Sequence, residues 1–132
     1  MTETLLSVAE LLAFRRNPAA SALVIMSAED CPPCQLVEEA LHLVDFPAGV
    51  AVMKAVASPA DKKTMGAVLK AGINNFPCIE VYAGGQRLAQ HHGAVGNDSR
   101  QVAHWLNHIA RDAEPSGVGE PRSEASSSLR RG

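Results

Sequence analysis

Residues 22–27 have the sequence ALVIMS, in which no polar side chain alternates with the apolar ones over most of the run. Successive side chains of a strand point to opposite faces of a sheet, so an uninterrupted apolar run predicts a strand buried on both faces. Such strands are typical of parallel sheets that helices cover on each side. Residues 50–56, VAVMKAV, form a second run of this kind. We therefore expect a sheet, at least partly parallel, between two layers of helices.

Helix signals precede the first of these runs. Ser7 and Glu10 have the S-x-x-E spacing of a capping box, and the pair Asn17-Pro18 marks the end of the short helix that follows. A short edge strand is expected just before this helix, over residues 4–6. The chain therefore begins with a strand and a helix before it enters the buried strand.

Two more helices are predicted in the middle of the chain. One starts at Pro33 and is expected to end at Pro47 and Gly49, because apolar residues recur there every three or four positions. Its apolar positions are Leu36, Val37, Ala40, Leu41 and Val44. The other is expected to open at Ser58-Pro59, with Ser58 as its cap. Its inner face would consist of Met65, Val68 and Leu69, ahead of a break at Gly72.

A hairpin and a last helix complete the predicted domain. Residues 79–82 and 87–91 flank a Gly-Gly pair, which favours a tight turn between antiparallel strands. Asn97 or Asp98 is expected to cap a helix that runs through Ala110. The fold class is thus α/β, with a mixed sheet flanked by helices on both faces. Beyond residue 112 the composition turns rich in Ser, Gly, Pro and charge, so we expect a folded domain over residues 1–112 and a disordered tail over residues 113–132.

The composition limits the kinds of molecule that the protein is expected to bind and the compartment in which it is expected to act. A formal charge of −2, spread along 132 residues, gives no reason to expect a nucleic acid or a membrane surface as partner. The first residues carry acids where a secretion signal needs Lys or Arg, and no apolar run approaches the roughly 20 residues that span a bilayer. We therefore expect a cytoplasmic protein. Three cysteines are an odd and sparse set, unlike those of secreted domains stapled by disulfides.

The segment AEDCPPCQLV, residues 28–37, places two cysteines between a buried strand and a predicted helix. A sulfur at Cys31 would lie beside unpaired backbone N–H groups at the positive end of the helix dipole. Helix N-termini with this spacing can lower a thiol pKa from about 8.5 toward about 7, and only the thiolate attacks disulfides. Cys34, one turn further, would lie within bonding reach. The pair could therefore attack a partner's disulfide and then release the reduced partner.

Two other interpretations of CPPC remain open at this point. Pro33 is favourable at the first position of any helix, so the pair could be a chance feature of a helix start. A zinc site is the second alternative, although zinc usually needs four nitrogen or sulfur ligands and the chain offers one further cysteine, Cys78. Pro32 and Pro33 also lack N–H donors and stiffen the loop, with opposing effects on the thiolate.

Three segments follow one another along the chain: SAEDCPPC (27–34), KAGINNFPCIEVYAGGQRL (70–88) and HHGAVG (91–96). The first resembles the active-site segment of the thioredoxin family, with Asp30 in place of the usual Trp. The second is similar to the family's helix end, cis-proline and hairpin, and the third to its glycine-bearing loop beside the site. The likeness covers most of residues 4–111 and implies the thioredoxin fold, a mixed sheet with helices on both faces.

The resemblance also implies roles for individual residues. It makes Cys31 the attacking thiol, Cys34 the resolving thiol and Pro77 the cis-proline that faces them. Substrate would bind along Pro32, Pro33, Phe76, Pro77, His92 and Gly93, with the backbone of Phe76 meeting an extended segment.

Two positions depart from the family pattern. The buried acid that is thought to move protons for the resolving thiol falls on Ile25, although Lys54 matches the lysine that usually accompanies it. Glu29, Asp30 or water would then have to relay protons. Asp30 also adds negative charge near the thiolate, which should raise its pKa and slow attack. Cys78, directly after Pro77, is expected to be a packed core thiol, with an auxiliary redox thiol or a metal ligand as alternatives.

Together these features predict a thiol-disulfide oxidoreductase that exchanges disulfides with protein substrates and needs no bound cofactor or metal. Its partners would be protein disulfides and a reductase that recycles the oxidised form, and we expect a monomer. The alternative is a thioredoxin-fold binding or chaperone module with little redox turnover, which the residues at positions 25 and 30 favour. A metal or iron-sulfur carrier is a third class.

Overall fold

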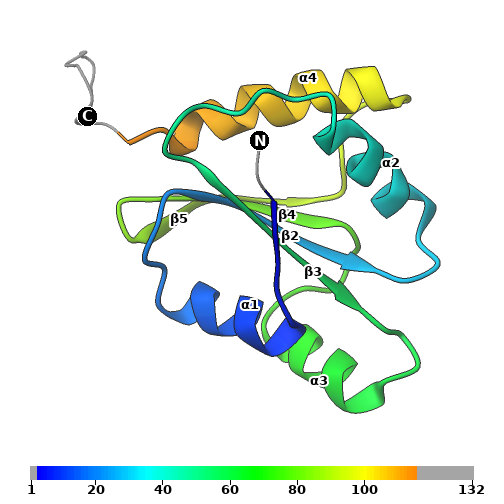
Figure 1. The fold of residues 1–132 in the computed structure, drawn as a ribbon. Helices are drawn as coiled ribbons and strands as arrows, with labels where there is room; N and C mark the ends of the chain where they lie inside the picture. The colour runs from blue at the N-terminus through cyan, green and yellow to red at the C-terminus, as the bar shows by residue number, and fades with distance from the viewer. Residues whose placement is uncertain (1–2, 116–132) are drawn as a thin grey trace.

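The computed structural model describes residues 3–115, which form a five-stranded sheet between two pairs of helices (Figure 1). The strands are β1 (Glu3–Leu5), β2 (Ala22–Ala28), β3 (Ala51–Ala57), β4 (Cys78–Ala83) and β5 (Gln86–His92). The helices are α1 (Val8–Arg16), α2 (Pro32–Leu41), α3 (Lys62–Lys70) and α4 (Ser99–Ala110), followed by a turn of 3-10 helix over Arg111–Ala113. Helices α2 and α4 cover one face of the sheet, and α1 and α3 cover the other. The predicted α/β class and the predicted order of elements are confirmed.

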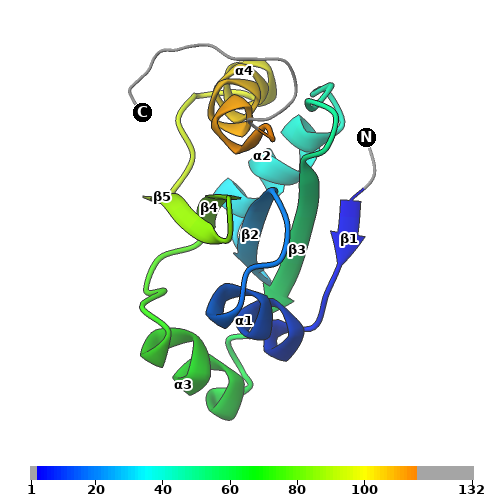
Figure 2. The same ribbon diagram turned by 90° about the vertical axis from the view of Figure 1, so that its left-hand side faces the viewer.

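The central position of β2 follows from its apolar sequence. The strands lie in the order β1-β3-β2-β4-β5, so β2 has a neighbour on each side (Figure 2). It pairs in parallel with β3, from Ala22 opposite Ala51 onward, and antiparallel with β4, where Met26 lies opposite Cys78. Residues 22–27 are all buried, because helices also cover both faces of this strand. The sheet is therefore mixed, as predicted.

Alternate residues of β2 enter two separate cores. Leu23 and Ile25 face α2 and α4, where the buried side chains of both helices meet the sheet. Val24 and Met26 face the opposite way, into a smaller core beneath α1 and α3. The period of two along a strand produces this division. Ala113, which the composition assigned to the tail, is fully buried in the first core, whereas Glu114 and Pro115 are exposed. Residues 116–132 of that predicted tail lie outside the described residues.

The turns that position these elements follow their local sequence. Ser7 and Glu10 form the predicted capping box of α1, and Asp98 caps α4 by accepting from the N–H of Gln101. Gly84 and Gly85 both have positive φ, at 61° and 78°, as a type I′ hairpin turn requires. None of the helices within residues 3–115 is long and apolar enough to span a bilayer.

Two predicted helix boundaries are wrong. Helix α2 ends at Leu41, because the backbone tightens there and the N–H of Leu43 donates to the carbonyl of Ala40 instead of one residue further back. Helix α3 begins at Lys62, not at Ser58-Pro59. Asp61 caps it by accepting from both the N–H and the hydroxyl of Thr64, whereas the carbonyl of Ser58 accepts from the N–H of Asp61 in the turn before the helix.

Two predicted burial patterns are also wrong. Leu69 is 56% exposed, because α3 reaches the core mainly through Val68. Strand β3 is buried only in part, since β1 pairs with it no further than Lys54 and leaves Val56 at an open edge. The two errors have one cause: the outer elements of this small fold are covered on one side only.

Candidate active site

The segment with the two cysteines lies where β2 passes into α2, at one end of the sheet (Figure 1). Glu29 and Asp30 form the connecting turn, and Asp30 has a φ of 53°, in the left-handed region that Asp tolerates better than most residues. Cys31 is the N-cap of α2, so its side chain lies at the positive end of the helix. The predicted order of strand, cysteine and helix is confirmed.

Cys31 and Cys34 form a disulfide, with Cα atoms 5.2 Å apart. The N–H of Cys34 donates to the Sγ atom of Cys31 over 3.3 Å, as it would to the oxygen of an ordinary N-cap residue. Cys34 is only 6% exposed, whereas Cys31 is partly exposed. A partner molecule therefore has access to one sulfur of the pair, that of Cys31.

The two prolines determine which backbone donors the sulfur meets. Pro32 and Pro33 occupy the first two helical positions, are exposed, and have no N–H to offer. The next N–H, from Cys34, reaches both the carbonyl oxygen and the sulfur of Cys31, and the N–H of Gln35 goes to that carbonyl. One backbone donor is thus aimed at the sulfur, where a helix without prolines would offer more.

The sheet register brings the other predicted site segments to the same end of the molecule. The Phe76–Pro77 peptide bond is cis, and Pro77 is buried just ahead of β4. Cys78 pairs with Met26 on one side and with His92 on the other. Gly93 follows with a φ of 130°, which suits glycine. Residues 76–78 and 92–93 therefore lie beside the strand end that leads to Cys31.

Ile25, where the thioredoxin family has a buried acid, is apolar, but an ion pair lies next to it. Ile25 is fully buried, and Lys54 lies opposite it in the β2–β3 register. The Nζ atom of Lys54 pairs with Glu38 of α2, and lies 3.1 Å from Oε2 of Glu3 on the edge strand. Burial opposes the charge on Lys54, whose side chain is 11% exposed, but the bonds from Glu38 and Glu3 outweigh it and raise its pKa.

Glu38, the partner of Lys54, is an acid that sequence reasoning did not single out. It lies four residues after Cys34 on α2, a spacing that puts two side chains on the same face of a helix. That spacing was visible in the sequence and could have identified it. Glu29 and Asp30, which were expected to replace the acid, are both exposed in the turn before Cys31.

Cys78 is a free and buried thiol on the α1 and α3 side of the sheet. Burial, together with the nearby charge of Glu80, raises its pKa to about 11, so it stays protonated at neutral pH. Within residues 3–115, no group of three or more His, Cys, Asp or Glu side chains is placed to hold a metal ion. These features favour the packed core thiol among the interpretations of Cys78.

Solved structures share the architecture that carries this site. Thioredoxin f2 of Chlamydomonas reinhardtii has 15% sequence identity and a TM-score of 0.59, over 87% of this chain and 100% of that one. Thioredoxin O2 of Arabidopsis thaliana has 20% identity and a TM-score of 0.57, over 82% of this chain and 94% of that one. Mitochondrial thioredoxin 3 of Saccharomyces cerevisiae has 14% identity and a TM-score of 0.56, over 82% of this chain and 93% of that one.

No protein-family model and no curated protein matches the sequence. At identities of 14% to 20%, the similarity to these three structures concerns the course of the backbone. The element order, the mixed sheet and the helix that starts at the cysteine pair agree with it. The chain therefore has the thioredoxin fold, with a Cys-Pro-Pro-Cys disulfide at the N-terminus of its second helix.

Proposed function

We propose that the protein is a thiol-disulfide oxidoreductase that acts on protein disulfides. The observation that carries this proposal is the Cys31–Cys34 disulfide at a helix N-terminus, with one sulfur accessible and the other buried. The positive helix end and the N–H of Cys34 favour a negative charge on Cys31 once the disulfide is reduced. The buried sulfur is held where it reaches Cys31 and is shielded from other molecules.

In the reductive direction the reaction has two exchange steps. The Cys31 thiolate attacks one sulfur of a substrate disulfide, a mixed disulfide forms, and the other substrate sulfur leaves as a thiolate that takes up a proton. Cys34 then loses its proton and attacks Sγ of Cys31, so that the Cys31–Cys34 disulfide forms and the second substrate sulfur leaves as a thiolate. Two electrons pass from the dithiol to the substrate. A dithiol reductase must return them for another turnover.

Glu38 is our candidate for the group that takes the proton from Cys34. It follows Cys34 by one helical turn, and its partner Lys54 occupies the place beside Ile25 where the family's acid would have its lysine. The transfer would run directly or through one water molecule. Glu38→Gln should therefore slow the second exchange step, whereas Glu39→Gln, on the exposed side of the same helix, should leave it unchanged.

Substrate binding is assigned to the surface around the accessible sulfur. Pro32 and Pro33, which are exposed, would border it on one side. The backbone of Phe76, just before β4, and the His92-Gly93 pair, at the end of β5, would border it on the other. An extended substrate segment would lie between these two borders. The further parts of the proposal, a cytoplasmic monomer that is recycled by a reductase, come from the sequence and the family resemblance.

Reduction of insulin disulfides by the full chain, with dithiothreitol as electron source, tests the proposal. The wild-type protein should accelerate insulin precipitation, and Cys31→Ser should abolish this activity. Cys78→Ser is the matched control and should keep the activity, because that thiol is buried and protonated. An inactive wild-type protein would instead support the alternative, a binding or chaperone module, which the apolar Ile25 favours.

A further inference from the structure

A pocket lies on the sheet face that carries α1 and α3, at the opposite end from the cysteines. It has a volume of about 740 Å³ and lies between α1, the C-terminal end of α3 and the β4–β5 turn. The residues that line it include Arg15, Arg16, Lys70, Tyr82, Gly85 and Arg87. Tyr82 pairs with Ala22 at the start of β2, whereas Cys31 follows the end of that strand. The pocket is therefore separate from the candidate active site.

The charge of the pocket wall has one sign. Four of the lining side chains are cationic, Arg15, Arg16, Lys70 and Arg87, and no Asp or Glu is among the residues that line it. The nearest counter-charge is the single carboxylate of Glu80, which is only 1% exposed beneath the wall. Four cationic groups against one carboxylate leave a net charge of +3, in a protein whose overall formal charge is −2.

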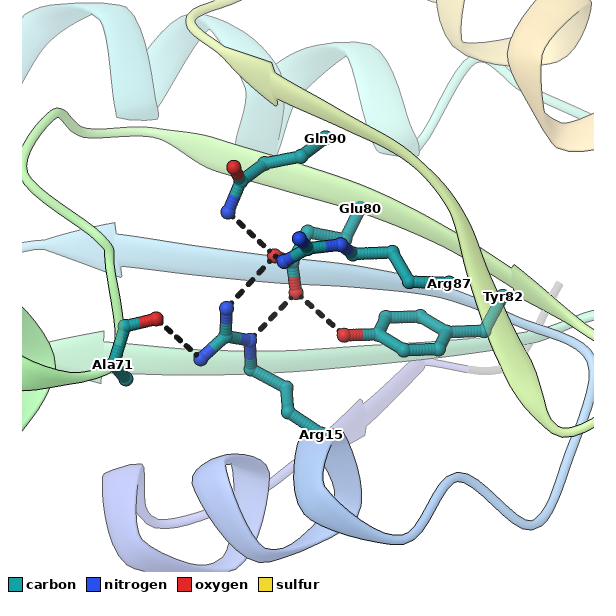
Figure 3. Close-up of polar contacts among 6 residues, drawn as sticks. All are labelled: Arg15, Ala71, Glu80, Tyr82, Arg87 and Gln90. Carbon is teal, nitrogen blue, oxygen red and sulfur yellow. Dashed lines mark hydrogen bonds and ion pairs between the residues drawn. The ribbon is translucent and has the colours of Figure 1, made fainter.

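Glu80 fixes part of this wall in place (Figure 3). Its two oxygens accept from Nε and Nη2 of Arg15 at 2.7 and 3.0 Å, and from Nη1 of Arg87 at 2.8 Å. They also accept from Tyr82 Oη at 2.9 Å and from Gln90 Nε2 at 2.8 Å. Arg15 donates its remaining terminal nitrogen to the carbonyl of Ala71, at 3.1 Å. The Arg15 guanidinium is therefore held in one orientation by α1, α3 and the sheet together.

The other cationic groups are available to a ligand. Arg87 is 44% exposed and uses only Nη1 on Glu80, so most of its donors remain free. Arg16 and Lys70 are exposed, and neither has an ion-pair partner among residues 3–115. Guanidinium groups bind phosphate through paired N–H donors, and a rigid wall lowers the ordering cost of binding.

We propose that this pocket binds a small molecule that carries two or more phosphate groups. Three cationic side chains of the pocket, Arg16, Lys70 and Arg87, keep free donors, and their combined charge matches two or more phosphates better than it matches a single carboxylate. The volume lies within the 300–1,000 Å³ typical of small-molecule sites, so phosphates and an organic group of nucleotide size would fit. The site is independent of the thiols and of the redox function proposed above.

Titration of the isotope-labelled full chain with pyrophosphate, followed by amide NMR, tests the site directly. Pyrophosphate should shift the amide signals of Lys70, Ala71 and Gly85, and leave those of Cys31 and Cys34 in place. ATP should bind more tightly than pyrophosphate if the organic group is also recognised, and equally tightly or less tightly if the phosphates alone are recognised. Adenosine should not bind. Shifts spread evenly over the surface, or tighter binding of a hexaglutamate peptide than of either phosphate ligand, would overturn the proposal.

A charge-reversed pair of variants separates the pocket from general electrostatics. Arg16→Glu with Lys70→Glu should weaken pyrophosphate binding at least tenfold in calorimetry, because both groups lose their attraction to phosphate. Arg100→Glu with Arg111→Glu changes the net charge equally on the opposite layer and should alter the affinity less than twofold. Equal losses of pyrophosphate affinity in the two double variants would refute the assignment of the ligand to this pocket. Should the first pair fail to fold, the NMR map of the wild-type chain still decides.

Discussion

Replacing Glu80 by glutamine should destabilise the protein by about 3 kcal/mol, because it removes the one carboxylate at the centre of a buried network. Removal of one partner from a buried ion pair typically costs about 3–5 kcal/mol, since the other charge is left uncompensated. The Arg15 side chain is only 10% exposed, so it falls in this class, whereas Arg87 at 44% can turn to solvent and adds little. Glutamine keeps one acceptor oxygen for Tyr82, which places the expected loss at the lower end of that range.

Urea unfolding at neutral pH measures this loss as a shift of the midpoint at constant slope. Glu39→Gln removes an exposed carboxylate and should change the free energy of unfolding by less than about 0.5 kcal/mol. A loss below about 1 kcal/mol in Glu80→Gln would refute the reasoning, since the network would then contribute no more than a surface ion pair.

The pH dependence of stability is a second test of what the Glu80 carboxylate contributes. Burial would raise the pKa of Glu80, but the hydrogen bonds from Arg15 and Tyr82 outweigh it and hold the pKa below its ordinary value of 4.5. A carboxyl group with a lowered pKa stabilises the fold above that ordinary value, and the contribution is lost as the pH falls through the folded-state pKa. The difference in the free energy of unfolding between the wild-type protein and Glu80→Gln should therefore be largest at neutral pH and shrink below pH 4.5.

Three further predictions concern the site and its surroundings. Glu38→Gln should slow the release of a mixed disulfide about tenfold at neutral pH in stopped-flow measurements, and an unchanged rate would exclude Glu38 as the proton acceptor. Gly96→Ala should cost about 3 kcal/mol on thermal or urea unfolding, because φ is 136° and a Cβ would lie 2.8 Å from a backbone nitrogen of α4. Gly66→Ala, in open space on α3, should instead stabilise by about 0.5–1 kcal/mol, and two effects of equal sign would contradict the geometry. Asp30→Asn should speed the alkylation of Cys31 in the reduced protein about twofold, and an unchanged rate would show that this exposed charge does not act on the thiolate.

Local patterns were sufficient to predict the part of the fold that carries the cysteines. The apolar run of residues 22–27 predicted a strand buried on both faces, and that strand is the centre of the sheet. The order of strand, cysteine and proline likewise predicted Cys31 at a helix start, because N-capping depends on neighbours within one turn. By contrast, the choice between Ser58 and Asp61 as cap depended on where the chain leaves β3, which local propensity does not specify.

Contacts between distant segments could not be predicted in this way. Arg15 and Glu80 are 65 residues apart, and nothing in either segment identifies the other as its partner before the sheet is assembled. The basic pocket depends on the same long-range arrangement. Glu38 was predictable only in part. Its spacing from Cys34 was visible in the sequence, but its pairing with Lys54 requires β3 to lie under α2.

The most direct test of the account is a map of which cysteine attacks a disulfide. The reduced Cys34→Ser protein, mixed with oxidised glutathione, should form a one-to-one mixed disulfide at Cys31 that mass spectrometry locates. The reduced Cys31→Ser protein should remain almost unmodified under the same conditions, since Cys34 and Cys78 are buried. Equal modification of both variants, or a mixed disulfide at Cys34 or Cys78, would contradict the role given to the accessible sulfur at the start of α2.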